Sequence, residues 1–334
     1  MEMLAITQPL QVPGIGAVGP DSGMVQLAIG GAGLFKVGHN GVKHILLPAD
    51  KKVEFIVYDD TTLAYVRSAL GHPAIYPLES ARIVKPVKAM LMDLDGTSVH
   101  SEHFWIWIIQ LSIASLMGNP KFELEDADLP FVSGHSVSEH LKHCITKYCP
   151  DKPLAKAREY YFEHTEREMQ AILDGHGQAN AFTPAPGLKE FLYALKAKDI
   201  KIGLVTSGLY QKAWPEILSA FKTLNMGDPA EFYDAIITAG FQVGRKGSPG
   251  TLGELSPKPH PWLYAETAAV GLGLSPSDRP SVVGLEDSGA GVVSIRLAGY
   301  ACIGLTGGNI VASGTRCLLQ DYCEGLEDVL KVIS

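Results

Sequence analysis

The pattern of apolar and polar positions changes character near residue 87. Beyond that point, short apolar runs alternate with stretches in which apolar residues recur at helical spacing. The predicted strands cover residues 87–92, 201–205, 235–238, 281–284 and 301–305. The predicted helices between them cover residues 188–196, 210–221, 261–270 and 291–297. This alternation predicts an α/β fold with a Rossmann-like, doubly wound parallel sheet.

A long helical insertion interrupts the alternation after the first strand. More than a hundred residues separate the first and second strands, and helical periodicity covers 102–117, 136–147 and 154–173. We interpret residues 101–183 as an inserted helical cap, and residues 87–100 and 184–334 as the core. An insertion at the end of a strand is well placed to act as a lid that selects substrate and excludes water.

Residues 1–86 differ from the rest because they are rich in glycine and proline. Short β-like runs at 24–29, 43–47 and 53–58 predict a small, mostly β domain. The spacing Gly14, Gly16 and Gly19 matches a GxGxxG motif. A dinucleotide site needs a strand before this motif and a helix after it, and Pro13 and Pro20 argue against both. We therefore expect a loop here, and a domain that serves homodimer formation or docking onto the core.

Composition narrows the classes of partner. The 334 residues carry a formal net charge of −8, which argues against nucleic acid or an anionic membrane surface as the main partner. No apolar stretch is long enough to span a bilayer, and the first residues lack the features of a secretory signal. The five cysteines show no CxxC spacing. Together these features predict a reducing, cytoplasmic location and no cysteine-based zinc site.

The run from Ala89 to Thr97 carries the strongest chemical signal. Its apolar residues predict a buried strand that ends in Asp93 and Asp95, followed by Gly96 and Thr97. Ligands of parallel α/β sheets bind at the carboxyl ends of strands. Two acids at such an end can bind a hard cation and still supply a carboxylate for nucleophilic attack or proton transfer.

Three more predicted strand ends carry suitable residues. Thr206, Ser207 and Gly208 precede a helix, where a hydroxyl and free N–H groups can bind phosphate oxygens. Lys258 lies between two prolines, which fix the backbone of its loop. Glu286 and Asp287 end the strand that precedes a glycine-rich turn and a helix. We expect this last pair to complete the cation site of Asp93.

The order of these motifs resembles that of the haloacid dehalogenase-like hydrolase superfamily over residues 87–334. The similarity is to the subgroup with a helical cap between the first and second motifs, which includes phosphoglycolate phosphatase-like enzymes and β-phosphoglucomutase. The four matching motifs are Asp93-Leu94-Asp95-Gly96-Thr97, Thr206-Ser207-Gly208, Lys258-Pro259, and Glu286-Asp287-Ser288 with Gly291 and then Ala298-Gly299.

The resemblance implies a role for each motif. Asp93 would be the nucleophile that forms an aspartyl phosphate, and Asp95 would be the general acid and base. Mg²⁺ would be held by the Asp93 and Asp287 carboxylates and the Asp95 carbonyl, with Glu286 as a ligand or a water-mediated acceptor.

The phosphoryl oxygens would contact the remaining motif residues. Lys258 would balance their charge, and hydroxyl or amide groups would donate hydrogen bonds to them. The expected phosphate-binding residues are Thr206, Ser207, Gly208, Gly96 and Thr97.

Asp95 also narrows the reaction that the resemblance implies. Dehalogenases of the superfamily lack an acid there, phosphonate-cleaving relatives have alanine, and ion-pumping ATPases have threonine. The expected activity is a Mg²⁺-dependent phosphatase acting on a small phosphorylated metabolite. The alternatives are a sugar-phosphate phosphomutase of the β-phosphoglucomutase type, or a non-catalytic phospholigand-binding or regulatory protein.

The chain departs from the family pattern in three places. His100 stands where relatives often have an acid, and it either faces the substrate or caps the first lid helix. Gly134 and His135 lie where relatives present a substrate-specificity loop. The segment 240–255 is longer than usual; its Arg245 and Lys246 either reach an anionic substrate or belong to a solvated loop.

Overall fold

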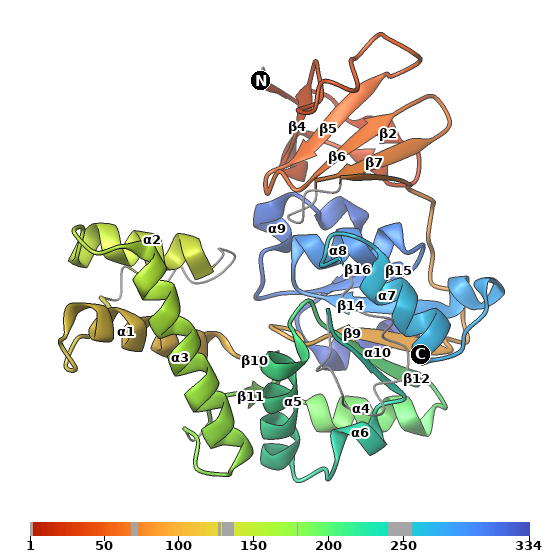
Figure 1. Cartoon of the computed structure of the whole chain (residues 1–334). Coiled ribbons are helices and arrows are strands. Elements are labelled where there is room, and N and C mark those ends of the chain that lie inside the picture. The colour runs from red at the N-terminus through yellow and green to blue at the C-terminus, as the bar shows by residue number, and fades with distance from the viewer. Residues whose placement is uncertain (1–2, 68–72, 126–127, 129–136, 179, 240–255) are drawn as a thin grey trace. The chain divides into compact units, whose positions relative to one another are not determined.

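The computed structural model describes residues 3–67, 73–125, 128, 137–178, 180–239 and 256–334 (Figure 1). The chain divides into two compact units. The first comprises Met1–Ser98, Pro186–Ala213 and Ala230–Ser334, and the second comprises Val99–Ala185 and Trp214–Pro229.

A six-stranded parallel sheet forms the centre of the first unit and confirms the predicted fold class. Its strand order is β13-β12-β9-β14-β15-β16. Strand β9 is buried along its whole length, as expected for the middle of a parallel sheet with both faces covered. The strands are β9 (Ala89–Asp93), β12 (Lys201–Val205), β13 (Ala235–Ile237), β14 (Val282–Glu286), β15 (Ala301–Leu305) and β16 (Asp321–Cys323).

Helices alternate with these strands close to the predicted positions. The predicted helix 261–270 is a short α-helix followed by a π-helical turn, Thr267–Gly271. The helices are α4 (Leu188–Ala197), α5 (Tyr210–Leu224), α6 (Pro229–Phe232), α7 (Trp262–Glu266), α8 (Gly289–Leu297), α9 (Ile310–Ser313) and α10 (Leu326–Ile333). Short 3₁₀ helices occur at Pro20–Ser22, Pro276–Ser281 and Arg316–Leu318.

The N-terminal region is an antiparallel β structure within the same unit. Six strands pair in the order β1-β4-β5-β6-β7-β8, and β2 and β3 form a separate hairpin. Gly14 and Gly16 belong to this hairpin, where a loop was expected. A Cβ at Gly14 would lie 2.3 Å from the Leu78 carbonyl oxygen, so the turn requires glycine. The strands are β1 (Met3–Ala5), β2 (Leu10–Val12), β3 (Gly16–Val18), β4 (Met24–Leu27), β5 (His44–Pro48), β6 (Val53–Val57), β7 (Thr62–Val66) and β8 (Ala74–Pro77).

This β region is docked onto the parallel-sheet core. Val12, Val18 and Leu78 share one continuous buried cluster with Val292 and other residues of α8 and the central sheet. The buried guanidinium of Arg296 donates hydrogen bonds to the carbonyls of Gly14 and Glu79, at 2.7 and 2.9 Å. Removing that apolar surface from water stabilises the docking, and the arginine fixes its register.

The second unit is mainly helical. Its helices are α1 (Glu102–Met117), α2 (Val137–Tyr148) and α3 (Leu154–Leu173), and two short strands, β10 (Val99–His100) and β11 (Thr183–Pro184), pair antiparallel. Phe104 of α1 packs on Phe182, with ring centroids 4.6 Å apart. The residues from Trp214 to the end of α5 also cluster with this unit.

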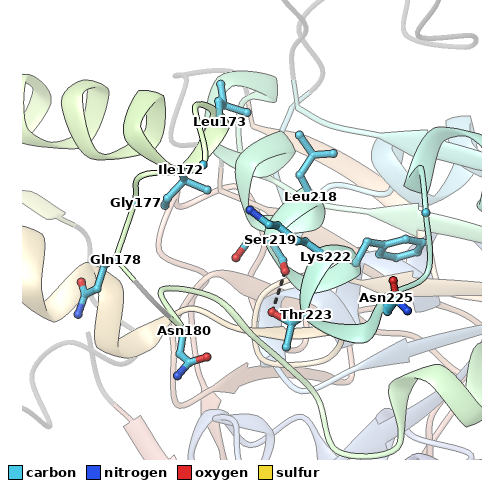
Figure 2. A pocket seen from close by; sticks show the side chains of 13 residues that line it. Ile172, Leu173, Gly177, Gln178, Asn180, Leu218, Ser219, Lys222, Thr223 and Asn225 are labelled. Atoms are coloured by element: carbon cyan, nitrogen blue, oxygen red, sulfur yellow. Dashed lines mark hydrogen bonds between the residues drawn. The ribbon is translucent and has the colours of Figure 1, made fainter.

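A pocket of about 790 Å³ lies in the helical unit, between the C-terminal end of α3, the following loop and α5 (Figure 2). Thr223 donates a hydrogen bond to the Ser219 carbonyl at its rim, at 3.0 Å. Among the described residues that line it, Lys222 is the one charged side chain and none carries a carboxylate. The described wall therefore lacks the acidic groups that the motifs place at the strand ends.

Two further observations concern the helices and the cysteines. Among the described residues, no helix combines the length and hydropathy needed to cross a bilayer. The five cysteines are free thiols, and four of them are buried.

Candidate active site

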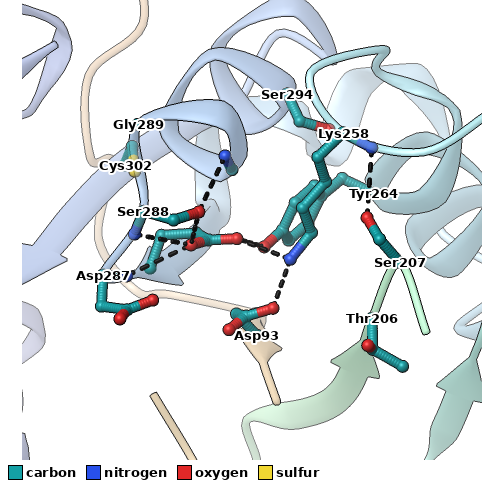
Figure 3. Close-up of polar contacts among 12 residues, drawn as sticks. Asp93, Thr206, Ser207, Lys258, Tyr264, Asp287, Ser288, Gly289, Ser294 and Cys302 are labelled. Atoms are coloured by element: carbon teal, nitrogen blue, oxygen red, sulfur yellow. Dashed lines mark hydrogen bonds and ion pairs between the residues drawn. The ribbon is translucent and has the colours of Figure 1, made fainter. Parts of the chain in front are cut away.

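Three neighbouring strands bring the motif residues to one edge of the parallel sheet. Strand β9 lies between β12 and β14, with Asp93 in register with Val205 and Met92 in register with Leu285. The carboxyl ends of β9, β12 and β14 therefore meet where the strand order changes direction, the usual position of ligand sites in such sheets. Figure 3 shows Asp93, Thr206 and Asp287 around this edge.

Lys258 joins the first and fourth motifs. Its ammonium group donates hydrogen bonds to Asp93 Oδ1 and, at 2.6 Å, to Glu286 Oε1 (Figure 3). Its backbone N–H also donates to Ser207 Oγ, at 3.2 Å, which ties the lysine loop to the second motif. The ion pairs with Asp93 and Glu286 raise the pKa of Lys258, although burial opposes them. The ammonium is therefore charged and held by two carboxylates.

Glu286 is fully buried, and both of its carboxylate oxygens have protein donors. Besides Lys258, Oε1 accepts from the Tyr264 hydroxyl at 2.7 Å. Oε2 accepts from the Ser288 N–H at 3.0 Å, the Ser288 hydroxyl at 2.9 Å and the Asp287 N–H at 3.2 Å. With its lone pairs so engaged, Glu286 is better suited to orient Lys258 and the turn before α8 than to bind a cation directly.

The carboxylates of Asp93, Glu286 and Asp287 offer oxygens within 4.8 Å of one another. Burial, and then the negative charge of Glu286, raise the pKa of Asp93 well above its usual value and that of Asp287 to about 7. Lys258 lowers both pKa values but supplies only one positive charge against three carboxyl groups. Clustered carboxylate oxygens short of positive charge fit a divalent cation such as Mg²⁺, held by Asp93 and Asp287.

The loop after Asp93 packs closely against Asp287. Gly96 has a φ of +83°, and a Cβ there would lie 2.2 Å from Asp287 Oδ2, so this position requires glycine. Asp95 is half-buried and adds negative charge to the surroundings of Asp93. Thr97 is buried, and its hydroxyl has no partner among the described residues. Ser98, which the motif reading overlooked, donates from its hydroxyl to the Asp93 carbonyl at 2.6 Å and braces the loop.

The second motif is placed at the end of β12. Thr206 is buried, and its hydroxyl accepts a hydrogen bond from the Gly208 N–H at 2.9 Å. Ser207 faces the lysine loop through the bond to Lys258 (Figure 3). Hydroxyl groups of this motif thus order the turn and connect it to the third motif.

The structure does not test the residues proposed for substrate selection. His100 is an exposed residue of β10, in the helical unit. Gly134 and His135 lie outside the described residues, as do Arg245 and Lys246. Their roles stay predictions.

Tyr264, like Ser98, was missed by sequence reasoning, whereas Ser288 belongs to the fourth motif. Tyr264 is fully buried, donates to Glu286 and places its ring 5.1 Å from the Lys258 ammonium. It lies outside every motif, so no sequence signal distinguished it from a core aromatic residue. Ser288 caps α8 by accepting from the Gly291 N–H at 3.1 Å, and its position before a helix was a recognisable signal.

Comparison with known proteins agrees with this arrangement. Residues 90–239 match a sequence model of the family described as haloacid dehalogenase-like hydrolase. The chain is 27% identical to a β-phosphoglucomutase of Bacillus subtilis (strain 168) over 66% of its own length and 83% of that protein's. It is 28% identical to a validoxylamine A 7'-phosphate phosphatase of Streptomyces hygroscopicus subsp. limoneus, over 66% of this chain and 85% of the relative.

A solved structure shares the fold. The crystal structure of a predicted phosphoglycolate phosphatase from Haemophilus somnus 129PT superposes with a TM-score of 0.55 at 18% identity. The match covers 74% of this chain and 98% of that one. About a quarter of the present chain therefore has no counterpart in that structure.

Proposed function

We propose that this chain, which matches the haloacid dehalogenase-like hydrolase family over residues 90–239, is a Mg²⁺-dependent phosphatase that hydrolyses a small phosphorylated metabolite through an aspartyl phosphate. The observation that carries this proposal is the cluster of Asp93, Glu286 and Asp287 oxygens within 4.8 Å, bridged by Lys258. One ammonium leaves this cluster short of positive charge, as a divalent-cation site requires.

Each residue has a part in the proposed reaction. An Asp93 oxygen attacks phosphorus, the bond from phosphorus to the ester oxygen breaks, and Asp95 protonates the departing alkoxide. Asp95 then removes a proton from water, which attacks phosphorus and releases inorganic phosphate from Asp93. Bound Mg²⁺ would supply positive charge that reduces the repulsion between Asp93 and the phosphoryl group. Lys258, which is paired with Asp93 and Glu286, supplies a second positive charge next to the nucleophile.

Phosphomutase activity is the second candidate. The two curated relatives, one a mutase and one a phosphatase, are nearly equally similar to this chain at 27% and 28% identity. The reactions share the attack of the aspartate and differ in the acceptor of the phosphoryl group: water in the phosphatase, a second substrate hydroxyl in the mutase. Residues outside the acidic cluster decide between these acceptors.

A screen of phosphate esters, with and without Mg²⁺, tests the proposal. Release of inorganic phosphate and isomerisation of sugar phosphates are measured in parallel. We expect Mg²⁺-dependent phosphate release that chelation abolishes and that Asp93→Asn lowers by about a thousandfold or more, because the amide is a poor nucleophile.

Asp60→Asn is the matched control, since Asp60 is exposed and lies in the turn between β6 and β7. This variant should keep full activity. Isomerisation without phosphate release would favour the mutase. Activity that persists in Asp93→Asn or in chelator would contradict the mechanism, and biological activity unchanged in Asp93→Asn would favour a non-catalytic binding protein.

A further inference from the structure

The N-terminal β region contacts the loop that carries Lys258. The Tyr76 hydroxyl and His260 Nδ1 share a hydrogen bond of 2.8 Å across 184 residues of sequence. Tyr76 belongs to β8, the edge strand of the N-terminal sheet, and His260 is two residues beyond Lys258. A residue of the N-terminal β region thus contacts the loop that carries Lys258.

The His260 ring has few hydrogen-bond partners to hold it in position. The ring is buried, with 3% of the residue exposed, and Tyr76 is the one hydrogen-bond partner of the ring among the described residues, since Nε2 has none there. The rings of Tyr76 and His260 meet edge to face, with centroids 5.8 Å apart, and Tyr76 packs in the same way on Trp262 at 6.3 Å. Tyr76 therefore contacts the loop on both sides of Pro261.

The backbone between Lys258 and His260 links the position of the histidine to that of the lysine. The His260 N–H donates to the Pro257 carbonyl at 3.1 Å, which closes a turn around Lys258. The His260 carbonyl accepts from the buried Ser294 hydroxyl of α8 at 2.6 Å. A shift of His260 would therefore move the turn from which the lysine side chain extends toward Asp93.

We propose that Tyr76 is a positioning residue: through His260, the N-terminal β domain holds the Lys258 loop in the geometry that the reaction needs. The family match begins at residue 90, so it includes neither Tyr76 nor the N-terminal sheet. The proposal gives this additional region a function at the active site. Its kinetic test rests on the proposed phosphatase function, whereas its structural test does not.

The variant Tyr76→Phe removes one hydroxyl and keeps the ring contacts with His260 and Trp262. We expect kcat to fall roughly three- to tenfold and KM to stay within about twofold, because Lys258 acts on the transferring phosphoryl group more than on bound substrate. Tyr58→Phe is the control: this half-buried tyrosine lies in the same domain, next to the end of β6, and is expected to behave as wild type.

The same substitution in a Lys258→Ala background separates positioning from general structural damage. If Tyr76 acts through the lysine, Tyr76→Phe should lower the residual activity of Lys258→Ala by less than about twofold. An equal loss in both backgrounds, or unchanged kcat in Tyr76→Phe, would overturn the proposal.

Amide hydrogen exchange provides a test independent of activity. In Tyr76→Phe, the peptide over residues 256–264 should exchange several times faster than in wild type, while β15 is unchanged. Unaltered exchange in that peptide would overturn the proposal whatever the kinetics show. A wild-type protein that releases no phosphate would contradict the proposed function, and the exchange result would still decide the role of Tyr76.

Discussion

Charge balance at individual carboxylates governs the candidate site. Glu286 is fully surrounded by donors, so its negative charge is stabilised by Lys258, Tyr264 and the turn before α8. Asp93 and Asp287 share these surroundings, and burial, followed by the negative charge of Glu286, raises the pKa values of both. The residues with raised pKa values are thus the ones free to bind a cation, while Glu286 is committed to the protein.

The raised pKa of Asp287 predicts how pH and Mg²⁺ act on stability. Because the folded-state pKa of about 7 exceeds the ordinary 3.8, the protonated carboxyl favours the fold, and that contribution is lost as pH rises through 7. Mg²⁺ binds the deprotonated form. It should therefore raise Tm more at about pH 8 than at about pH 5.5. Thermal unfolding with Mg²⁺ or chelator at both pH values measures this.

The control for this prediction is Asp287→Asn, because the asparagine amide does not titrate between about pH 5.5 and about pH 8. Its response to Mg²⁺ should be small and should not grow with pH. A Tm shift of equal size at both pH values in the wild type would mean that Mg²⁺ does not bind at this carboxylate.

At the scale of elements, the junction of β14 and α8 depends on a small residue. A Cβ at Gly291 would lie 1.7 Å from Glu286 Oε1, so the first turn of α8 has room for the buried carboxylate only because position 291 is glycine. The N-terminal end of α8 then lies against this negative charge, which the helix dipole stabilises.

Gly291→Ala should therefore be harmful although alanine favours helices by about 0.5–1 kcal/mol over glycine. We expect a loss of about 1–3 kcal/mol in the free energy of unfolding, from overpacking, and at least about a tenfold fall in kcat as Glu286 releases Lys258. Denaturant unfolding and phosphate release measure the two effects.

Gly325→Ala serves as the matched substitution. Gly325 caps α10 with extended backbone, and its Cβ would enter open space. Near-wild-type stability is expected there. If Gly291→Ala were equally mild, the close packing of Glu286 against α8 would be wrong.

The elements themselves were largely predictable where a strong pattern existed. Three elements have the predicted bounds: the strands Lys201–Val205 and Ala301–Leu305 and the helix Leu154–Leu173. A strand buried on both faces leaves a continuous apolar run in the sequence, and a helix buried on one face leaves a helical period. Strands β8 and β16 were missed. Both are short edge strands with mixed exposure, so pairing rather than local pattern determines them. Strand β7 was also missed, although it is as long as β12.

For the site, motif order located the residues at the strand ends but not those that hold them in place. Tyr264 and Tyr76 reach Glu286 and His260 across long stretches of sequence, and such contacts leave no local pattern. His135 lies outside the described part of the chain, so its role stays a prediction.

At the scale of the whole molecule, the N-terminal β region and the parallel-sheet core form one unit with a shared apolar interior. Arg296 strengthens the connection, since its buried guanidinium binds two carbonyls of the N-terminal region. The region is therefore part of the scaffold that supports the lysine loop, although it lies outside the family match, which begins at residue 90.

The most direct test of the account is to identify the residue that carries the phosphoryl group during turnover. A substrate found in the ester screen is mixed with enzyme and Mg²⁺, the reaction is quenched in acid, and the peptides are analysed by mass spectrometry. The account predicts one phosphoryl group on the peptide that contains Asp93, absent in Asp93→Asn. Phosphorylation at another residue would contradict it, as would a phosphoryl-enzyme that still forms in Asp93→Asn.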